Sequence, residues 1–256
     1  MSGDAELQAL PGPARQVWRE VDGLRLYLAQ QADLQALAAL AQDSDWLQEE
    51  EKAALARIKS AARRTEYLCG HAWLRWLLAR ELACQPEQVR LAFSAQHKPY
   101  ALPGPAGQAA PAWNLSHAHG HFALVLGPPA APAGTAAFKP CGGLGVDIEF
   151  PQQVSAAELR QLAQGFCHAQ ELAHLHALPD SAVSQAFLRL WCGKEAVAKA
   201  LGCGFLFSPK RIVLQAESFV DGAVQTVQLE GMQRQVALWQ WRVEGDGVLG
   251  VARVLG

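Results

Sequence analysis

The sequence lacks the features that mark metal–thiolate, membrane-spanning and nucleic-acid-binding proteins. Its six cysteines include no pair at CxxC spacing, which argues against a zinc ribbon. No apolar run is long enough to cross a membrane, because the stretch from Phe122 to Leu126 ends at a Gly-Pro-Pro sequence. The net charge of −2 provides no overall positive field to attract nucleic acid. Because we find no signal peptide, we expect a cytoplasmic protein with free thiols.

The length and composition allow a large single domain or two small lobes. The chain has 256 residues, of which 50% are hydrophobic and 18% are charged. Alternating apolar residues in the first half predict a hairpin around Asp22-Gly23. Apolar stripes then predict helices over residues 34–41, 46–60 and 63–82, with Asp45 capping the second. Extended segments are predicted at 89–100 and from Trp113 onward.

The second half repeats this order of elements after a Pro- and Ala-rich stretch at residues 127–140. It offers a strand at 145–150, helices within 155–175 and 184–201, and strands near 212–214, 223–229, 236–243 and 248–254. The sequences LRWL from Leu74 and LRLW from Leu188 fall at comparable points of the two halves. We therefore predict an α+β fold of two similar lobes. The predicted divisions are a mobile N-terminus at 1–14, a lobe at 15–128, a linker at 129–143 and a lobe at 144–256.

Two acids alternate with apolar residues in the segment GVDIEF, from Gly145 to Phe150. The β-branched neighbours predict a strand, so Asp147 and Glu149 project from one face. Like charges at this spacing repel each other, and a cation between them would remove the repulsion. Carboxylate oxygens are the ligands that Mg²⁺ prefers. The alternative is a solvated edge strand with two unrelated acids.

The segment WCGKEAVAKALG, from Trp191 to Gly202, predicts a helix that ends at its last glycine. Glu195 and Lys199 lie one turn apart, so one interpretation is a surface ion pair. The other interpretation makes Glu195 a third acid for the same metal and lets Lys199 meet a phosphate. Lys194 adds a second amine.

These two segments, with KPY at Lys98 and WNLSHA at Trp113, resemble the signatures of the 4'-phosphopantetheinyl transferases. The order and length resemble the two-lobed type that activates surfactin synthetase. The resemblance implies a monomer of two pseudo-symmetric lobes with the active site between them. It implies transfer of 4'-phosphopantetheine from coenzyme A to a serine of an apo acyl, peptidyl or aryl carrier protein, with release of adenosine 3',5'-bisphosphate.

The resemblance also implies roles for individual residues. Asp147, Glu149 and Glu195 would hold Mg²⁺, and Glu195 is the first candidate for the base. Lys199, and less strongly Lys194, would stabilise charge on the leaving group. The catalytic set is thus Asp147, Glu195 and Lys199. The residues that would bind coenzyme A are Arg63, Arg64, Lys98, Pro99, Ser116, His117, Lys194 and Lys199.

Other functions remain open. A Mg²⁺-dependent exonuclease can also carry a DxE strand, but that leaves KPY and WNLSH unexplained and offers no surface for a nucleic-acid backbone. An inactive carrier-binding module would not need three acids. His117, His119 and His121 alternate in an HxHxH pattern that could bind zinc.

A carrier protein should meet an apolar surface with a basic fringe. The candidates are the segment from Gly202 to Phe207, with Phe205 and Phe207 exposed, and the segment from Phe166 to Leu175. The sequence does not distinguish fatty acid, polyketide and nonribosomal peptide synthesis.

Overall fold

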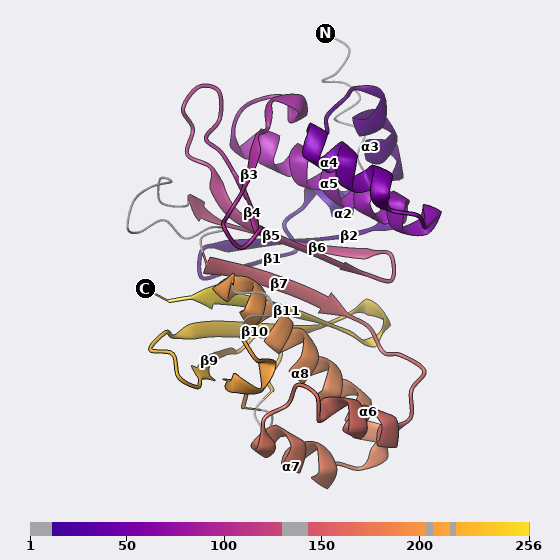
Figure 1. Ribbon diagram of the computed structural model, residues 1–256, viewed down its shortest axis with the longest axis vertical. Coiled ribbons are helices and arrows are strands. Elements are labelled where there is room, and N and C mark those ends of the chain that lie inside the picture. The colour runs from indigo at the N-terminus through magenta and orange to yellow at the C-terminus, as the bar shows by residue number, and fades with distance from the viewer. Residues whose placement is uncertain (1–11, 130–142, 203–206, 216–218, 256) are drawn as a thin grey trace. The chain divides into compact units, whose positions relative to one another are not determined.

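The computed structural model describes residues 12–129, 143–202, 207–215 and 219–255 (Figure 1). The chain divides into two compact units, residues 1–142 and 143–256. Both units combine a sheet with helices, which confirms the predicted α+β fold. Most of the predicted mobile N-terminus and linker lies outside the described residues. None of the helices described is long and apolar enough to cross a membrane.

The first unit contains a four-stranded antiparallel sheet in the order β1-β2-β6-β5 and a separate β3-β4 hairpin. The predicted hairpin at Asp22-Gly23 is confirmed, because both residues have the positive φ that a tight turn requires, 49° and 72°. The elements are α2 (Gly12–Arg15), β1 (Arg19–Val21), β2 (Leu24–Gln30), α3 (Gln31–Asp43), α4 (Glu49–Arg57), α5 (Ala61–Glu81), η1 (Pro86–Gln88), β3 (Leu91–Phe93), β4 (Pro99–Ala101), β5 (Pro111–Ala118) and β6 (His121–Pro129).

The second unit contains a five-stranded antiparallel sheet in the order β7-β11-β10-β9-β8. The predicted helical segment at 155–175 consists of two helices, α6 and α7. The elements are β7 (Leu144–Glu149), α6 (Ala156–Ala163), α7 (Ala169–Ala177), α8 (Asp180–Leu201), η4 (Pro209–Arg211), β8 (Ile212–Val213), β9 (Val224–Leu229), β10 (Val236–Val243), η6 (Glu244–Asp246) and β11 (Gly247–Val254).

Helix α8 lies close against β7 and β11 because two glycines let it approach. A Cβ atom at Gly145 of β7 would clash with the carbonyl of Ala196. A Cβ atom at Gly250 of β11 would lie 3.1 Å from the carbonyl oxygen of Cys192. Gly145 therefore faces α8, and by strand alternation Asp147 and Glu149 face the same helix.

A buried ion pair joins α4 to α5 in the first unit. Arg75 is fully buried and Glu51 is 4% exposed. Arg75 Nε donates to Glu51 Oε2 at 3.0 Å, and its terminal nitrogen donates to the carbonyl of Val89 at 2.9 Å. Glu51 also accepts the backbone N–H of Gln48 at 2.9 Å, as in a capping box. Helix α4 therefore begins after Gln48, and the predicted cap at Asp45 is wrong.

A matching buried pair joins α7 to α8 in the second unit. Lys194 Nζ lies 2.7 Å from Glu171 Oε2, and both side chains are almost completely buried. Glu171 accepts the backbone N–H groups of His168 at 2.7 Å and Leu214 at 2.8 Å. Lys194 donates to the carbonyl of Pro209 at 2.9 Å. Glu51 and Glu171 are each the third residue of their helix, so the two pairs occupy equivalent places.

This equivalence corrects the register of the internal repeat. Arg75 is as far from Ala61, the first residue of α5, as Lys194 is from Asp180, the first residue of α8. The similar letters LRWL and LRLW had placed Arg75 opposite Arg189 instead. Arg189 pairs with Asp221, an exposed residue that precedes β9. The similarity of LRWL and LRLW does not show which basic side chain points into the core. The register that this similarity gave for the repeat is therefore wrong.

Candidate functional site

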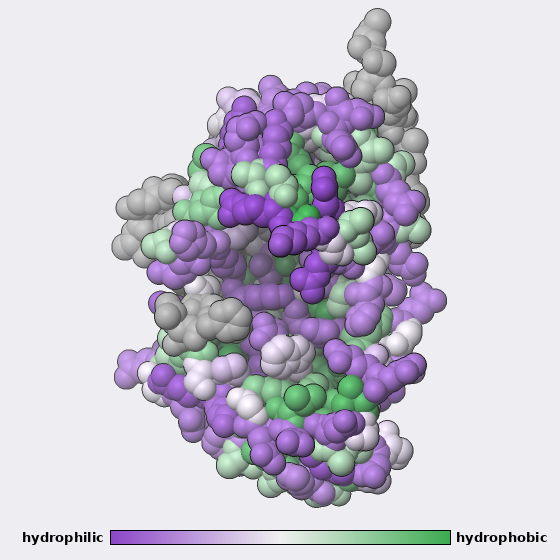
Figure 2. All heavy atoms as spheres, turned by 45° about the vertical axis from the view of Figure 1, so that its right-hand side comes forward, coloured by the Kyte–Doolittle hydropathy of each residue, from purple (hydrophilic) through white to green (hydrophobic). Residues whose placement is uncertain are grey.

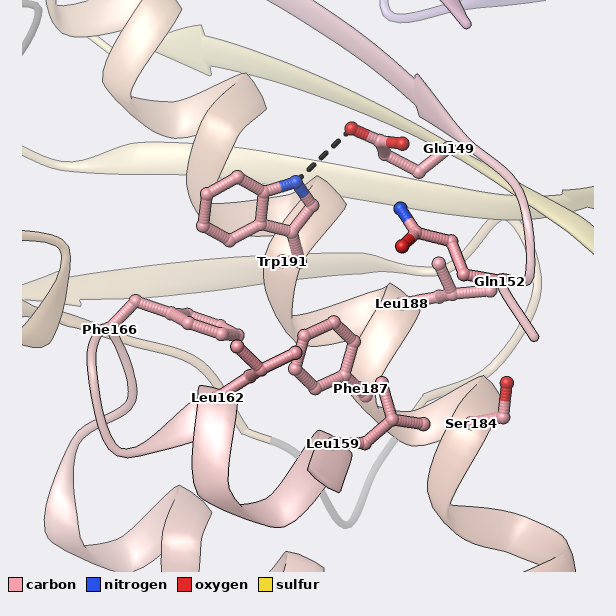
Figure 3. A pocket seen from close by; sticks show the side chains of 9 residues that line it. All are labelled: Glu149, Gln152, Leu159, Leu162, Phe166, Ser184, Phe187, Leu188 and Trp191. Carbon is pink, nitrogen blue, oxygen red and sulfur yellow. Dashed lines mark hydrogen bonds between the residues drawn. The ribbon is translucent and has the colours of Figure 1, made fainter. Parts of the chain in front are cut away.

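Three acids and a lysine lie along the contact between β7 and α8. Lys199 Nζ donates to Asp147 Oδ1 at 2.7 Å and to the Val146 carbonyl at 3.1 Å. Trp191 Nε1 donates to Glu149 Oε1 at 3.1 Å (Figure 3). Trp191, Glu195 and Lys199 follow one another at i, i+4 and i+8, so they share one face of α8. Glu195 therefore lies on this face between the two contacts with the strand acids.

The charges of Asp147 and Lys199 act on the carboxyl group of Glu195. Burial raises the pKa of the Glu195 carboxyl, the charge of Asp147 raises it further, and the charge of Lys199 lowers it. Asp147 is 4% exposed and is paired with the ammonium group of Lys199. A buried carboxylate needs such a partner, because removal from water disfavours its charged form. The acids that the sequence pattern singled out thus lie along one contact between β7 and α8, and their joint action on a metal stays a prediction.

The donor set is chemically suited to a hard cation, although it is not a closed cage. No group of three His, Cys, Asp or Glu side chains in the described parts of the chain is close enough to hold a metal ion. Mg²⁺ is usually held by one or two carboxylates together with waters and substrate phosphates. Asp147, Glu149 and Glu195 supply carboxylate oxygens on facing elements, and one or two of them would meet the requirement of such an ion.

Lys194 does not belong to this site. Its side chain is 1% exposed and is bound to Glu171 and to the carbonyls of Pro209 and Ile212. An ammonium group has three donors, and these three partners account for them. The prediction that Lys194 binds coenzyme A is therefore wrong. Lys194 directly precedes Glu195, and adjacent residues of a helix point in different directions. The side chain of Lys194 points into the core.

The remaining predicted contacts to coenzyme A lie in the first unit. Arg63 and Arg64 are exposed in the first turn of α5. Lys98 and Pro99 are half-buried in the β3-β4 hairpin, where the backbone N–H of Lys98 donates to Ser94 Oγ at 3.1 Å. Ser116 and His117 lie on β5, where Ser116 is 7% exposed and His117 is exposed. These assignments stay predictions.

The alternating histidines do not form a strand site for zinc. His117 lies on β5 and His121 begins β6, but His119 lies in the turn between them with a φ of 50°. The HxHxH pattern therefore runs around a hairpin, and its side chains do not share one strand face. The described residues include no cluster of metal-ligating side chains at this turn.

A pocket of about 370 Å³ lies beside Glu149 between α6 and α8 (Figure 3). Its lining is Glu149, Gln152, Leu159, Leu162, Phe166, Ser184, Phe187, Leu188 and Trp191. Leu162 is 57% exposed at its edge. In Figure 2, hydrophobic side chains reach the surface of the second unit in the lower part of the view, with hydrophilic residues around them. Sequence reasoning missed this pocket, because its residues come from three segments.

The predicted carrier surface after α8 is corrected in part. Phe207 is only 5% exposed, and the guanidinium carbon of Arg211 lies 4.7 Å from the centre of its ring. The aromatic ring packs against the core, as large apolar side chains usually do, and its surface is thereby removed from water. Phe205 lies outside the described residues. The prediction of an exposed Phe207 is wrong.

Comparison with known proteins identifies the second unit. Residues 143–252 match the family described as the 4'-phosphopantetheinyl transferase superfamily. Over these residues, which form most of the second unit, the chain is similar to that superfamily. The matched region contains all three acids and Lys199, which are the residues that the sequence motifs singled out. The more specific likeness to the surfactin-synthetase type stays a prediction.

Two relatives carry transferase names. A putative 4'-phosphopantetheinyl transferase of Synechocystis sp. is 28% identical over 158 residues, which are 62% of this chain and 58% of the relative. The 4'-phosphopantetheinyl transferase HetI of Nostoc sp. is 30% identical over 174 residues, which are 68% of this chain and 65% of the relative. The matches therefore span less than two thirds of either relative. Neither name supports a nuclease or an inactive binding module.

Proposed function

We propose that this protein is a phosphopantetheinyl transferase, which transfers the 4'-phosphopantetheine group of coenzyme A to a serine of an apo carrier protein. The observation that carries the proposal is the pairing of Asp147 with Lys199 beside Glu149 and Glu195, in the unit that matches the superfamily. This arrangement combines acids for a divalent cation with an amine for a phosphate. A pyrophosphate substrate needs both.

Asp147, Glu149 and Glu195 are the proposed ligands of Mg²⁺. When bound, the ion would neutralise pyrophosphate oxygens and favour departure of the leaving group. The acids do not all need to contact the ion at once, because Mg²⁺ retains several waters. Lys199 donates a hydrogen bond to Asp147 at 2.7 Å and so holds this carboxylate beside α8.

Glu195 is the proposed general base. Its pKa is raised by burial and by Asp147, which brings it closer to the neutral pH at which a base works well. It would accept the proton of the carrier serine hydroxyl. The serine oxygen then forms a bond to the phosphorus next to pantetheine, and the bond from that phosphorus to adenosine 3',5'-bisphosphate breaks. Lys199 would stabilise the negative charge that develops on the leaving group.

Coenzyme A binding by the first unit remains part of the proposal. Lys98, Ser116 and His117 would contact phosphate oxygens, while Arg63 and Arg64 would suit the 3'-phosphate because guanidinium groups bind phosphates in a fork geometry. We propose acyl, peptidyl or aryl carriers as the partners and a monomer as the active form. Membership of fatty acid, polyketide or nonribosomal peptide synthesis depends on the carrier.

The test is incubation of the purified chain with coenzyme A, Mg²⁺ and an apo carrier, followed by mass spectrometry of the carrier. We expect the carrier to gain the mass of phosphopantetheine and adenosine 3',5'-bisphosphate to be released. A carrier whose acceptor serine is replaced by alanine is the matched control. A carrier that stays apo while a single-stranded oligonucleotide is degraded would favour the nuclease. Carrier binding without transfer would favour the inactive module.

A further inference from the structure

The indole ring of Trp191 has an apolar contact on one side and a carboxylate on the other. Its Nε1 donates to Glu149 Oε1 at 3.1 Å, while its ring forms part of the wall of the neighbouring pocket (Figure 3). We infer that Trp191 is a positioning residue that orients the Glu149 carboxylate for a divalent cation. This inference rests on the proposed function.

Aromatic packing fixes the indole before it meets the acid. The ring of Phe166 lies 4.9 Å from that of Trp191 at an interplanar angle of 78°, and it lies 5.3 Å from the ring of Phe187 at 87°. Such edge-to-face pairs have a preferred geometry, so they restrict the rotation of the indole. Phe187 and Trp191 are one turn apart on α8, and Phe166 comes from the segment after α6. The three rings therefore hold the Nε1–H group in a set direction.

Glu149 has particular need of such a donor. It is the last residue of β7 and is half-buried, and its carboxylate lies at the end of a long side chain. The terminal torsion of glutamate has a broad energy profile, so the backbone alone does not set the plane of the carboxylate. A hydrogen bond to Oε1 sets this plane and thereby the direction of Oε2. Asp147 is held comparably by Lys199, so each strand acid has its own partner on α8.

The expected size of the effect follows from hydrogen-bond partners of metal ligands in other proteins. Loss of such a partner weakens metal affinity or activity by about 10- to 100-fold. Trp191→Phe keeps an aromatic ring for contact with Phe166 but has no N–H to donate. We expect the lower end of that range, about tenfold, because Asp147 and Glu195 remain.

The first experiment measures Mn²⁺ binding in the presence of coenzyme A, by electron paramagnetic resonance of the free ion. Mn²⁺ accepts the same oxygen ligands as Mg²⁺ and can be counted directly. Trp191→Phe and Glu149→Gln should each raise the dissociation constant about tenfold or more. The double variant should bind no more weakly than Glu149→Gln alone, because Trp191 acts through Glu149. Phe187→Leu is the matched control, since it alters the same aromatic cluster without removing the donor.

The second experiment observes the hydrogen bond itself by nuclear magnetic resonance of indole N–H groups in ¹⁵N-labelled protein. The resonance that disappears in Trp191→Phe belongs to Trp191. This resonance should shift in Glu149→Gln, because a neutral amide is a weaker acceptor than a carboxylate. In transfer assays, Trp191→Phe should need more Mg²⁺ for half-maximal activity and should recover its kcat at saturating metal.

The outcomes separate this inference from the proposed function. If Glu149→Gln weakens Mn²⁺ binding and Trp191→Phe leaves it unchanged, the positioning role is overturned and the metal assignment stands. If Glu149→Gln leaves Mn²⁺ binding unchanged, the metal role of Glu149 fails and the role of Trp191 fails with it. If Phe187→Leu weakens binding as much as Trp191→Phe, packing explains the effect and the inference is again overturned.

Discussion

Helix α5 in the first unit and helix α8 in the second occupy equivalent places, but they present different side chains to the strand beside them. The buried cations Arg75 and Lys194 set the register between the two helices. In this register Trp76 corresponds to Glu195, and Arg80 corresponds to Lys199. The position of Lys199 thus has a cation in both helices, whereas the position of Glu195 has an acid only in α8.

The neighbouring strands differ in the same way. Tyr27 of β2 pairs with Leu124 of β6, and Asp147 of β7 pairs with Gly250 of β11. Each strand lies beside the second strand of a hairpin, and Tyr27 and Asp147 are each the fourth residue of their strand, so the two positions correspond. Burial raises the pKa of Tyr27, and the charges of Arg25 and Arg80 lower it. The corresponding cations have different contacts, because Lys199 donates a hydrogen bond to Asp147 whereas the guanidinium of Arg80 lies over the ring of Trp76.

The two units share the contacts that stabilise the fold but differ in the side chains at the candidate site. Both units keep a buried ion pair between a capped short helix and the long helix, and both bring the long helix onto the sheet. At the positions of the three acids, the first unit has the buried residues Tyr27, Ala29 and Trp76. One arrangement of elements therefore supports an apolar core in one unit and a charged site in the other.

The largest expected effect concerns the acids that only the second unit has. Glu195→Gln or Asp147→Ala should reduce transfer by at least about 100-fold, since each loses a group that acts on the reacting atoms. The melting temperature should stay near that of the parent chain, because the loss of repulsion between like charges offsets the loss of the contact between Asp147 and Lys199. Transfer assays and thermal unfolding check this. Trp76→Phe in the first unit should retain activity, and parental rates in the acid variants would contradict the assignment.

The buried pairs should dominate stability in both units. Arg75→Met and Lys194→Met should each lower the free energy of unfolding by about 3 to 5 kcal/mol, because an acid is left buried and uncompensated. Urea unfolding measures this loss. The double variant Glu171→Leu with Lys194→Met is the control, and it should recover part of the stability. If either single variant lowers the free energy of unfolding by less than about 1 kcal/mol, the two ion pairs do not stabilise their units equally.

Acid should weaken the first unit through Glu51. Burial raises the pKa of this carboxyl, but the hydrogen bonds from His71 and Arg75 outweigh burial and lower it to about 2 from 4.5. Because the folded pKa is the lower one, its stabilisation is complete above pH 4.5 and is lost as the pH falls toward 2. The full contribution is about 3 kcal/mol.

Thermal unfolding between pH 6 and pH 2.5 checks this contribution. The stability difference between the parent chain and Glu51→Gln should be largest at pH 6 and should shrink toward pH 2.5. A difference that stays constant across this range would contradict the low pKa of Glu51.

The smallest expected effect concerns coenzyme A binding by the first unit. His117→Ala should raise the KM for coenzyme A about 2- to 10-fold and leave kcat unchanged, as expected for one hydrogen bond that is equally strong in substrate and transition state. Steady-state kinetics measure both constants. His119→Asn is the matched control, because it changes a histidine in the adjoining turn. An unchanged KM in His117→Ala removes this residue from the proposed site.

Local patterns in the sequence were informative where the neighbours along the chain determine the structure. The hairpin at Asp22-Gly23 follows from turn chemistry, and the strand and helix that carry Asp147 and Glu195 follow from apolar periodicity. The α+β fold and the similarity to the superfamily are also visible in the order of these patterns. The cap at Asp45 was mispredicted because the actual cap, formed by Gln48 and Glu51, is supported by contacts with another helix. Such contacts are not visible in the local sequence.

The sequence alone determined which side chains are candidates for the chemistry, because residue types and short-range periodicity are written along the chain. Only the tertiary structure decided which of two adjacent residues, Lys194 or Glu195, enters the core. It also decided that Trp191 meets Glu149 and that Lys199 meets Asp147. These contacts join residues more than forty positions apart, and they depend on the close approach of α8 to the glycines of the sheet. No pattern within one segment encodes such an approach.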